Sequence, residues 1–232
     1  MRMGCSVTPD AVAIEAGAVK LQGLLRLPRD ANSVVLFAHG SGSGRLSPRN
    51  TFVAERLGQD GIGTLLFDLL TEDEEEIDAV TAALRFNIPL LTERLVAATE
   101  WTLRQQRLQQ LAVGYFGAST GAAAALAAAA QIPQVSAVVS RGGRPDLAGP
   151  ALSRVRAPTL LIVGGNDTQV LALNRQALRQ LSCEAQLAVV PGATHLFVEP
   201  GTLEEVASLA AAWFAHHARV RRDPSAAVTG SK

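Results

Sequence analysis

Gly117, Ser119 and Gly121 form the pattern G-x-S-x-G, in which a serine can occupy a sharp turn between a strand and a helix. An apolar run over residues 111–116 precedes the pattern, and an alanine-rich run over residues 122–130 follows it. Glycines two positions on either side of the serine let the strand and the helix approach each other closely. The pattern predicts that Ser119 is a nucleophile if groups that activate its hydroxyl lie elsewhere in the chain.

His195 is the histidine best placed to activate Ser119. A serine hydroxyl is a weak nucleophile near neutral pH and needs a base that accepts its proton. Of the four histidines, His39 precedes the serine, and His216 and His217 end the last predicted helix, where solvent and the helix dipole favour them. His195 follows the last predicted strand in a glycine-containing loop, from which its side chain can reach the carboxyl edge of a sheet.

Asp167 is the candidate carboxylate that would orient His195. It closely follows the apolar run at residues 159–163, so it is expected at the same sheet edge as Ser119. As an alternative, its carboxylate could cap the helix that follows. Two other carboxylates remain as alternatives, although neither ends a predicted strand: Asp146 and Glu199.

Backbone amides near Ser119 are candidates for stabilising the negative oxygen of a tetrahedral intermediate. One is the amide of Thr120, which directly follows the nucleophile. The second is expected from the glycine-rich loop at residues 39–44, where Ser41 is our choice and Gly42 the alternative. The loop lacks the glycine spacings of dinucleotide-binding and phosphate-binding loops, so nucleotide binding is not expected.

The spacing of apolar residues predicts an α/β fold. Alternation over residues 12–27 indicates an antiparallel hairpin at a sheet edge. Beyond it, short apolar runs alternate with helical patterns, which is typical of a mainly parallel sheet covered by helices on both faces. The expected strands are residues 34–38, 63–68, 111–116, 135–140, 159–163 and 185–190, and the expected helices are residues 48–59, 90–104, 121–130, 171–181 and 202–216. Together these elements predict a three-layer α/β/α sandwich.

The chain is expected to fold as one domain over residues 12–218. A length of 232 residues with 48% hydrophobic residues is sufficient for one core. Residues 1–11 are interpreted as an N-terminal extension, and residues 219–232, which lack apolar periodicity, as a disordered tail. The connection over residues 141–158 is too short for a large cap. The acidic run in the 72–89 segment indicates a solvated loop or a helix N-terminus, and the segment could form a partial cover over the site.

Charge and cysteine content argue against several other classes of protein. The chain has 21 basic and 21 acidic residues, so no net charge would attract nucleic acid or an anionic membrane. No apolar run of about 18 residues occurs, and residues 1–18 lack the apolar core of a signal peptide, which together predict a cytoplasmic location. Cys5 and Cys183 are too few for a disulfide framework and do not cluster with histidines, so no metal site and no cofactor is expected.

Two arginines follow a predicted strand at the same edge as Ser119. Arg141 and Arg144 could bind an acidic group of a substrate, because guanidinium groups form paired hydrogen bonds with carboxylates. The alternative is structural pairing of these arginines with Asp146 or another carboxylate. Gly42 is a further candidate for substrate contact, since its backbone can approach a ligand closely.

With these pieces in place, the chain resembles the α/β-hydrolase superfamily and, within it, the dienelactone hydrolase-like branch of small enzymes without a lid. The resemblance covers most of residues 12–216 and is carried by the segments 39–44, 117–121, 164–167 and 192–195. It implies hydrolysis of a small carboxylic ester through an acyl-serine intermediate. Dienelactone hydrolases proper use a cysteine nucleophile, whereas this chain has Ser119 at the matching position, which argues against dienelactone as the substrate.

Other functions remain compatible with the same residues. The chain is similar to hydrolase domains that some bacterial proteins carry beside a phosphoribosyltransferase domain, but no such second domain is expected within these 232 residues. The same three groups could serve a thioesterase or an acyltransferase, which differ from an esterase in leaving group and acceptor. A non-catalytic binding protein on the same fold is a further alternative, although an intact set of candidate groups argues against it.

Overall fold

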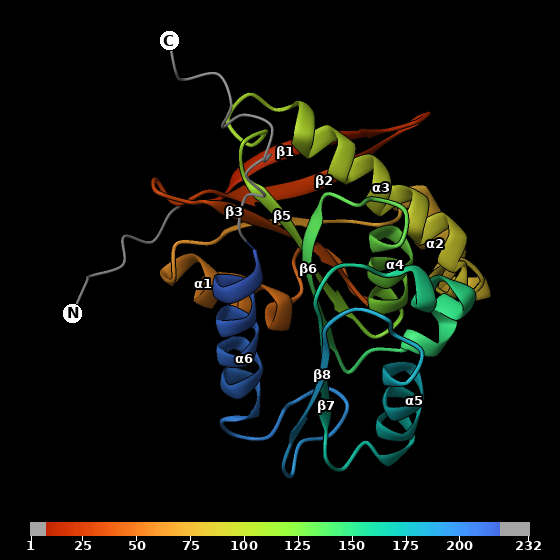
Figure 1. The fold of residues 1–232 in the computed structure, drawn as a ribbon. Helices are drawn as coiled ribbons and strands as arrows, with labels where there is room; N and C mark the ends of the chain where they lie inside the picture. The colour runs from red at the N-terminus through yellow and green to blue at the C-terminus, as the bar shows by residue number, and fades with distance from the viewer. Residues whose placement is uncertain (1–7, 219–232) are drawn as a thin grey trace.

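The computed structural model describes residues 8–218, and its centre is a single sheet of eight strands (Figure 1). The strand order across the sheet is β1-β2-β4-β3-β5-β6-β7-β8. β1 and β2 pair in antiparallel fashion, β2 also runs antiparallel to β4, and the remaining pairs are parallel. The fold is therefore the expected mainly parallel sheet with an antiparallel N-terminal hairpin.

The hairpin of β1 (Asp10–Ala16) and β2 (Val19–Arg26) forms because apolar residues alternate with polar ones. Ile14 and Leu21 are fully buried, whereas their sequence neighbours are exposed. Gly17, in the tight turn between the strands, has a φ of 64°, which a residue with a side chain rarely adopts. β1 begins two residues before the predicted start of the domain at residue 12.

The central strands are buried on both faces, as their continuous apolar runs predict. Five strands are buried along their whole length: β3 (Ser33–Ala38), β4 (Gly63–Phe67), β5 (Ala112–Ala118), β6 (Val135–Arg141) and β7 (Thr159–Gly164). The edge strand β8 (Ala185–Val190) is only partly buried. Because β3 to β8 are parallel to one another, their carboxyl ends meet at one edge of the sheet.

Helices cover both faces of this sheet (Figure 1). α1 (Pro48–Gln59) and α6 (Thr202–His217) pack on one face, against apolar side chains of β3, β5 and β6. The opposite face carries α3 (Ile88–Arg104), α4 (Thr120–Ala129) and α5 (Thr168–Leu178). Buried alanines make up most of α4, and their small size allows this helix to lie close to the sheet.

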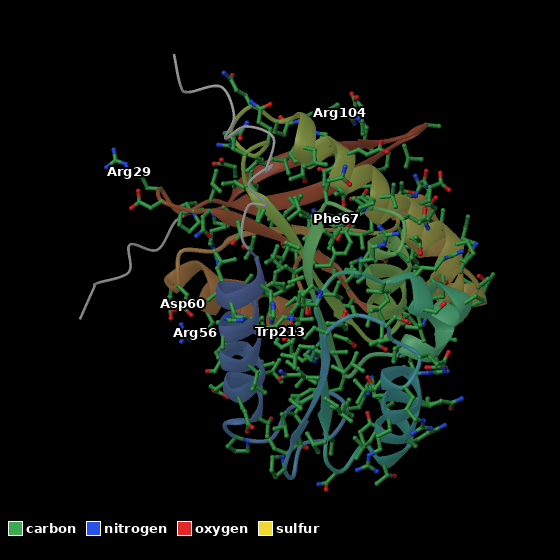
Figure 2. The ribbon with its side chains drawn as sticks, viewed as in Figure 1. Arg29, Arg56, Asp60, Phe67, Arg104 and Trp213 are labelled. Carbon is green, nitrogen blue, oxygen red and sulfur yellow. The ribbon has the colours of Figure 1, made fainter. Side chains whose placement is uncertain are left out.

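Apolar side chains fill the interior of the fold, and most charged side chains lie at its surface (Figure 2). Phe67, at the end of β4, lies inside the fold and is almost fully buried. Arg56 and Asp60 lie on the outer side of α1 and form an ion pair at 2.8 Å. Within residues 8–218, no helix combines the length and the apolar character that a membrane span requires.

The 72–89 segment is the main part of the chain for which the sequence predicted no single secondary structure. It contains α2 (Glu72–Thr81) and a short 3-10 helix, η1 (Leu84–Phe86). The Thr71 hydroxyl accepts a hydrogen bond from the Glu74 amide, and the Glu74 carboxylate accepts one from the Thr71 amide. This capping box starts the helix, so the acidic run is a helix N-terminus rather than a loop.

The connection after β6 contains no large insertion, in agreement with the predicted absence of a large cap. It holds η2 (Pro145–Arg154), a 3-10 segment that is interrupted at Gly149. The predicted tail at residues 219–232 lies outside the described residues, as do residues 1–7 of the predicted N-terminal extension.

Candidate active site

Ser119 lies on the sharp turn between β5 and α4. Its backbone has φ 51° and ψ −122°, a conformation that strains a residue with a side chain by roughly 1–3 kcal/mol. A Cβ atom on Gly117 would lie 2.5 Å from the Ala122 Cα atom, and one on Gly121 would collide with the Ala38 carbonyl oxygen. Both glycines are therefore required for the close approach of strand and helix that the sequence pattern predicts.

Hydrogen bonds fix the backbone of Ser119 from two sides. Its amide donates to the Arg141 carbonyl at 3.3 Å, and its carbonyl accepts from the Arg144 amide at 3.0 Å. The Ala122 amide donates to the same carbonyl at 3.1 Å. The strained turn is thus held by the end of β6 and by the first turn of α4.

The imidazole of His195 is hydrogen-bonded to the carboxylate of Asp167. Nδ1 of the histidine lies 2.6 Å from Oδ2 of the aspartate, whose side chain is 13% exposed, compared with 39% for His195. Asp167 occupies the N-cap position of α5, but its side chain makes no capping hydrogen bond. A proton on Nδ1 donates to the carboxylate and leaves Nε2 of a neutral ring with a lone pair that can accept a proton.

Ser119 and His195 both contact the turn formed by residues 142–144. The Arg144 amide, at the end of this turn, donates to the Ser119 carbonyl. A Cβ atom on Gly142, which has φ 51°, would lie 3.1 Å from the His195 carbonyl oxygen and 3.6 Å from its Cε1 atom. The buried Asn174 side chain donates to the carbonyl of Gly143, in the middle of the turn, at 2.9 Å. One short, well-held turn therefore lies against both the serine and the histidine.

The two alternative carboxylates have other partners. Asp146 forms a paired ion contact with Arg144, at 2.9 and 2.7 Å. Glu199 accepts hydrogen bonds from the hydroxyl and the amide of Thr194, at 2.6 and 3.1 Å, and the hydroxyl is the main reason that the pKa of Glu199 is lowered. Glu199 therefore holds the loop that carries His195.

The glycine-rich loop after β3 lies against Ser119. A Cβ atom on Gly40 would be 2.9 Å from the Ser119 Cβ atom, so the loop passes directly beside the candidate nucleophile. The hydroxyl oxygens of Ser41 and Thr120 are 3.2 Å apart, which brings the two predicted oxyanion-binding residues together. Gly42 has φ 63° and lines a cavity of about 610 Å³ beside this loop.

His39 holds the start of this loop, a role that the sequence did not reveal. The residue is 6% exposed, and its Nε2 atom accepts a hydrogen bond from the Leu69 amide at 2.9 Å. Its Nδ1 atom lies 3.0 Å from the Gly40 carbonyl oxygen, so the ring is neutral with its proton on Nδ1. Burial lowers the pKa of His39 and favours this neutral form. The available signal was its position at the carboxyl end of a predicted strand.

Asp68 holds the other end of the same loop and was also missed. It follows β4 at the functional edge of the sheet, and its carboxylate accepts a hydrogen bond from the Arg45 amide at 2.7 Å. The carboxylate also forms an ion pair with the Arg45 guanidinium. A Cβ atom on Gly44 would lie 2.8 Å from Asp68 Oδ1, so this contact also requires a glycine.

The two arginines that follow the predicted strand have different surroundings. Arg144 pairs with Asp146, which is the structural alternative that the sequence left open. Arg141 is 7% exposed, and its Nη2 atom donates to Asn50 Oδ1 at 3.5 Å. Burial, followed by the nearby charge of Arg49, lowers the pKa of Arg141 to about 10, so its guanidinium stays charged near neutral pH.

Comparison with known proteins assigns this arrangement to a family. A sequence model described as the Dienelactone hydrolase family matches residues 21–219. The chain belongs to the dienelactone hydrolase family. It is 57% identical in sequence to a dienelactone hydrolase from Anabaena variabilis, whose crystal structure matches with a TM-score of 0.91. The match includes 93% of this chain and 100% of the Anabaena chain.

Other relatives add information on fold and on domain organisation. An α/β serine hydrolase without a lid from Xanthomonas campestris shares the fold, with 19% identity, a TM-score of 0.71 and coverage of 90% of this chain and 94% of that one. Two curated Mycobacterium tuberculosis proteins, from strains CDC 1551 and H37Rv, are 56% identical over 210 residues, or 90% of this chain. Both are named putative phosphoribosyl transferases, but the chain spans only 46% of their length. Membership of the dienelactone hydrolase family supports hydrolase activity for this chain.

Proposed function

We propose that this member of the dienelactone hydrolase family hydrolyses small carboxylic esters through an acyl-serine intermediate. The observation that carries the proposal is the 2.6 Å hydrogen bond between His195 and Asp167, beside the turn that also holds the Ser119 backbone. In this proposal Ser119 is the nucleophile, His195 the general base, and Asp167 the group that orients and stabilises the imidazole.

The reaction would proceed in two halves. Ser119 Oγ attacks the ester carbonyl carbon while His195 Nε2 takes up the hydroxyl proton. The Asp167 carboxylate stabilises the imidazolium, and collapse of the tetrahedral intermediate expels the alcohol, which receives that proton. Water then attacks the acyl-serine with His195 again acting as base, and the carboxylic acid leaves as the serine hydroxyl is restored.

The amides of Ser41 and Thr120 are the proposed donors to the oxyanion. Support comes from the 3.2 Å approach of their hydroxyl oxygens and from the contact between Gly40 and Ser119. Loss of one such donor typically lowers kcat by about 10²–10³-fold. His39 contributes indirectly, because it anchors the loop from which the Ser41 amide projects.

The surroundings of the site favour small or exposed esters. The connection after β6 contributes only η2, so it adds no large cap. Large apolar side chains are exposed on two loops at the same edge of the sheet: Leu46 on the loop after β3, and Leu196 and Val198 on the loop that carries His195. These side chains offer an apolar surface to the acyl or alcohol group without the enclosed tunnel that a long acyl chain needs.

Ser119→Ala is the direct test of the proposal. We expect hydrolysis of p-nitrophenyl acetate to fall at least about a thousandfold, because no other group replaces the nucleophile, while circular dichroism and Tm remain those of the parent. A fluorophosphonate probe should label the parent and fail to label this variant. Ser153→Ala, at an exposed serine on η2, is the matched control and should keep both activities. Undiminished turnover in Ser119→Ala would contradict the assignment.

The same assay ranks the three candidate carboxylates. Asp167→Asn should lower kcat by about 10⁴-fold, because the amide no longer holds the tautomer that leaves Nε2 unprotonated. Asp146→Asn and Glu199→Gln should cost far less, since these carboxylates bind Arg144 and Thr194. A larger loss in either of these two variants would assign the third member of the triad to that residue.

Product analysis separates the related reactions. A thioesterase or an acyltransferase would form the same acyl-serine, and competition between water and an added alcohol distinguishes transfer from hydrolysis. The 39% exposure of the His195 side chain favours water as the acceptor, because the site does not exclude it. Failure of the fluorophosphonate probe to label the parent at any pH would favour a non-catalytic binding protein.

A further inference from the structure

Arg49 and Arg141 differ from every other arginine within residues 8–218, because they are at least half-buried and yet form no ion pair with a carboxylate. Arg141 is 7% exposed, and Arg49 is half-buried. The other arginines of this range that are at least half-buried all form ion pairs: Arg26, Arg45, Arg56, Arg85, Arg94 and Arg144. The remaining arginines of the range are exposed.

Several donors of these two guanidinium groups are buried without a partner. Nε and Nη1 of Arg141 and Nε of Arg49 make no hydrogen bond within the described chain and have almost no contact with solvent. The remaining contact of Arg141 is the 3.5 Å hydrogen bond to Asn50, which is long. Burying charged donors without acceptors is costly, so an added acceptor that reaches these groups would stabilise them.

The positions of the two arginines add positive potential in one place. Arg49 is the second residue of α1, and the first turn of this helix contains no acidic residue, so its charge adds to the positive end of the helix dipole. Arg141 ends β6 and reaches the first turn of α1 through Asn50. The charge of Arg49 is close enough to lower the pKa of Arg141. Two like charges held together in this way attract an anion.

The arginine pair is connected to the proposed hydrolytic site. Arg49 lines the cavity of about 610 Å³ beside the glycine-rich loop, and the Arg141 carbonyl accepts the hydrogen bond from the Ser119 amide. The cavity lining also contains Asp68, which pairs with Arg45, and three carboxylates at the start of α2: Glu72, Glu75 and Glu76. An anion in this cavity would therefore bind on the side of α1 and avoid α2.

We propose that Arg49 and Arg141 form a binding site for a small oxyanion, either a carboxylate or a phosphate group, next to the hydrolytic site. Both kinds of group have oxygen atoms that match the forked donors of a guanidinium. The oxyanion comes either from free phosphate in solution or from an acidic group on the ester substrate. The binding itself is independent of the proposed function, whereas the second source rests on it.

The binding test uses inorganic phosphate and the Ser119→Ala protein, so that its result does not depend on hydrolysis. In a chloride-poor buffer, phosphate should bind saturably in calorimetry and raise Tm with its concentration. Arg49→Gln should weaken the affinity at least about tenfold, because a charge-assisted hydrogen bond is lost. Arg141→Gln should weaken the phosphate affinity similarly. Arg49→Gln is the main test variant, because Arg49 is only half-buried and its substitution disturbs folding less.

Arg175→Gln is the matched control, because Arg175 is an exposed arginine in the last turn of α5, on the opposite face of the sheet from α1. This variant should bind phosphate as tightly as its Ser119→Ala parent. Absence of saturable binding, or equal phosphate affinity in Arg49→Gln and its parent, would overturn the proposal.

Kinetics with the active protein distinguish the two sources of the oxyanion. If the substrate carries it, Arg49→Gln should raise KM for mono-p-nitrophenyl succinate about tenfold more than for p-nitrophenyl acetate, and phosphate should compete with the succinate ester. If the anion is free phosphate, Arg49→Gln should change the two KM values by the same factor while still weakening phosphate binding. A protein that hydrolyses neither ester would contradict the proposed function and leave the phosphate measurement as a separate result.

Discussion

At the scale of single residues, several polar side chains hold the loops of the candidate site rather than react. They bind backbone groups at the carboxyl edge of the sheet: His39, Asp68, Asn174 and Glu199. Such contacts matter for catalysis because a displacement of about 1 Å in a reacting group can cost roughly a hundredfold in rate. The proposed nucleophile and base thus depend on neighbours that carry no chemistry of their own.

His39 makes the stability of the protein sensitive to acid. Burial lowers its pKa in the folded protein below the ordinary value of 6.5 for histidine. Below about pH 6.5, His39 is protonated in the unfolded chain but stays neutral in the folded chain. The contribution of His39 to stability therefore falls as the pH falls toward its lowered folded-state pKa. In His39→Gln, an amide oxygen can still accept from Leu69, and the free energy of unfolding should decrease less between about pH 7 and about pH 5 than in the parent.

Urea unfolding at these two pH values, followed by circular dichroism, measures the effect. His216→Gln is the matched control because His216 is exposed near the end of α6, and this variant should retain the full decrease of the parent. An identical pH dependence in His39→Gln and the parent would show that another group is responsible.

At the scale of elements, the close packing of α4 against β5 and β3 decides where Ser119 lies. Gly121, in the first turn of α4, has no room for a side chain, because a Cβ atom there would collide with the backbone carbonyls of Ala38 and His39. Backbone atoms cannot rotate away as side chains can. The position of α4, and with it the strained turn at Ser119, therefore requires that residue 121 has no side chain.

Two glycine substitutions test this packing. Gly121→Ala should lower the free energy of unfolding by about 3 kcal/mol or more, or prevent folding, because the backbone must shift. Gly58→Ala is the matched control: its Cβ atom would meet only the Arg26 Cδ atom at an ordinary 3.5 Å, and alanine in α1 should raise stability by about 0.5–1 kcal/mol. Urea unfolding gives both values, and equal stabilities of Gly121→Ala and the parent would contradict the tight packing.

At the scale of the whole molecule, the two larger apolar cores lie on opposite faces of one sheet. Trp101, on α3, packs against one core, and Trp213, on α6, belongs to the other. The two cores share the central strands, whose successive side chains point to alternate faces. Loss of one face therefore removes the support of the other, and the described part of the chain should unfold as one cooperative unit.

Single-tryptophan variants test this cooperativity, because the chain contains only two tryptophans. Trp213→Phe leaves Trp101 as the reporter of one face, and Trp101→Phe leaves Trp213 as the reporter of the other. Within each variant, the urea midpoint from fluorescence should coincide with the midpoint from circular dichroism. Separate midpoints in either variant would mean that the two faces unfold independently.

The sequence by itself determined the order and type of most elements and the residues at their ends. The helix at residues 48–59 was predicted with its observed bounds, because apolar spacing and a proline at the first position are local signals. Ser119, Asp167 and His195 were selected as candidates because each follows a strand of a parallel sheet, and such strands end at one edge. The remaining sequence signal, the acidic run at residues 72–76, was compatible with both a loop and a helix start.

Only the tertiary structure decided which of these residues are partners. Asp167 rather than Asp146 or Glu199 faces His195. The half-buried Arg49 and the buried Arg141 come together from segments about ninety residues apart. Periodicity reports which face of an element is apolar, because that depends on a few neighbouring residues. The choice among partners instead depends on side-chain rotamers, on loop paths and on the strand order β4-β3-β5-β6, all of which arise from contacts between distant parts of the chain.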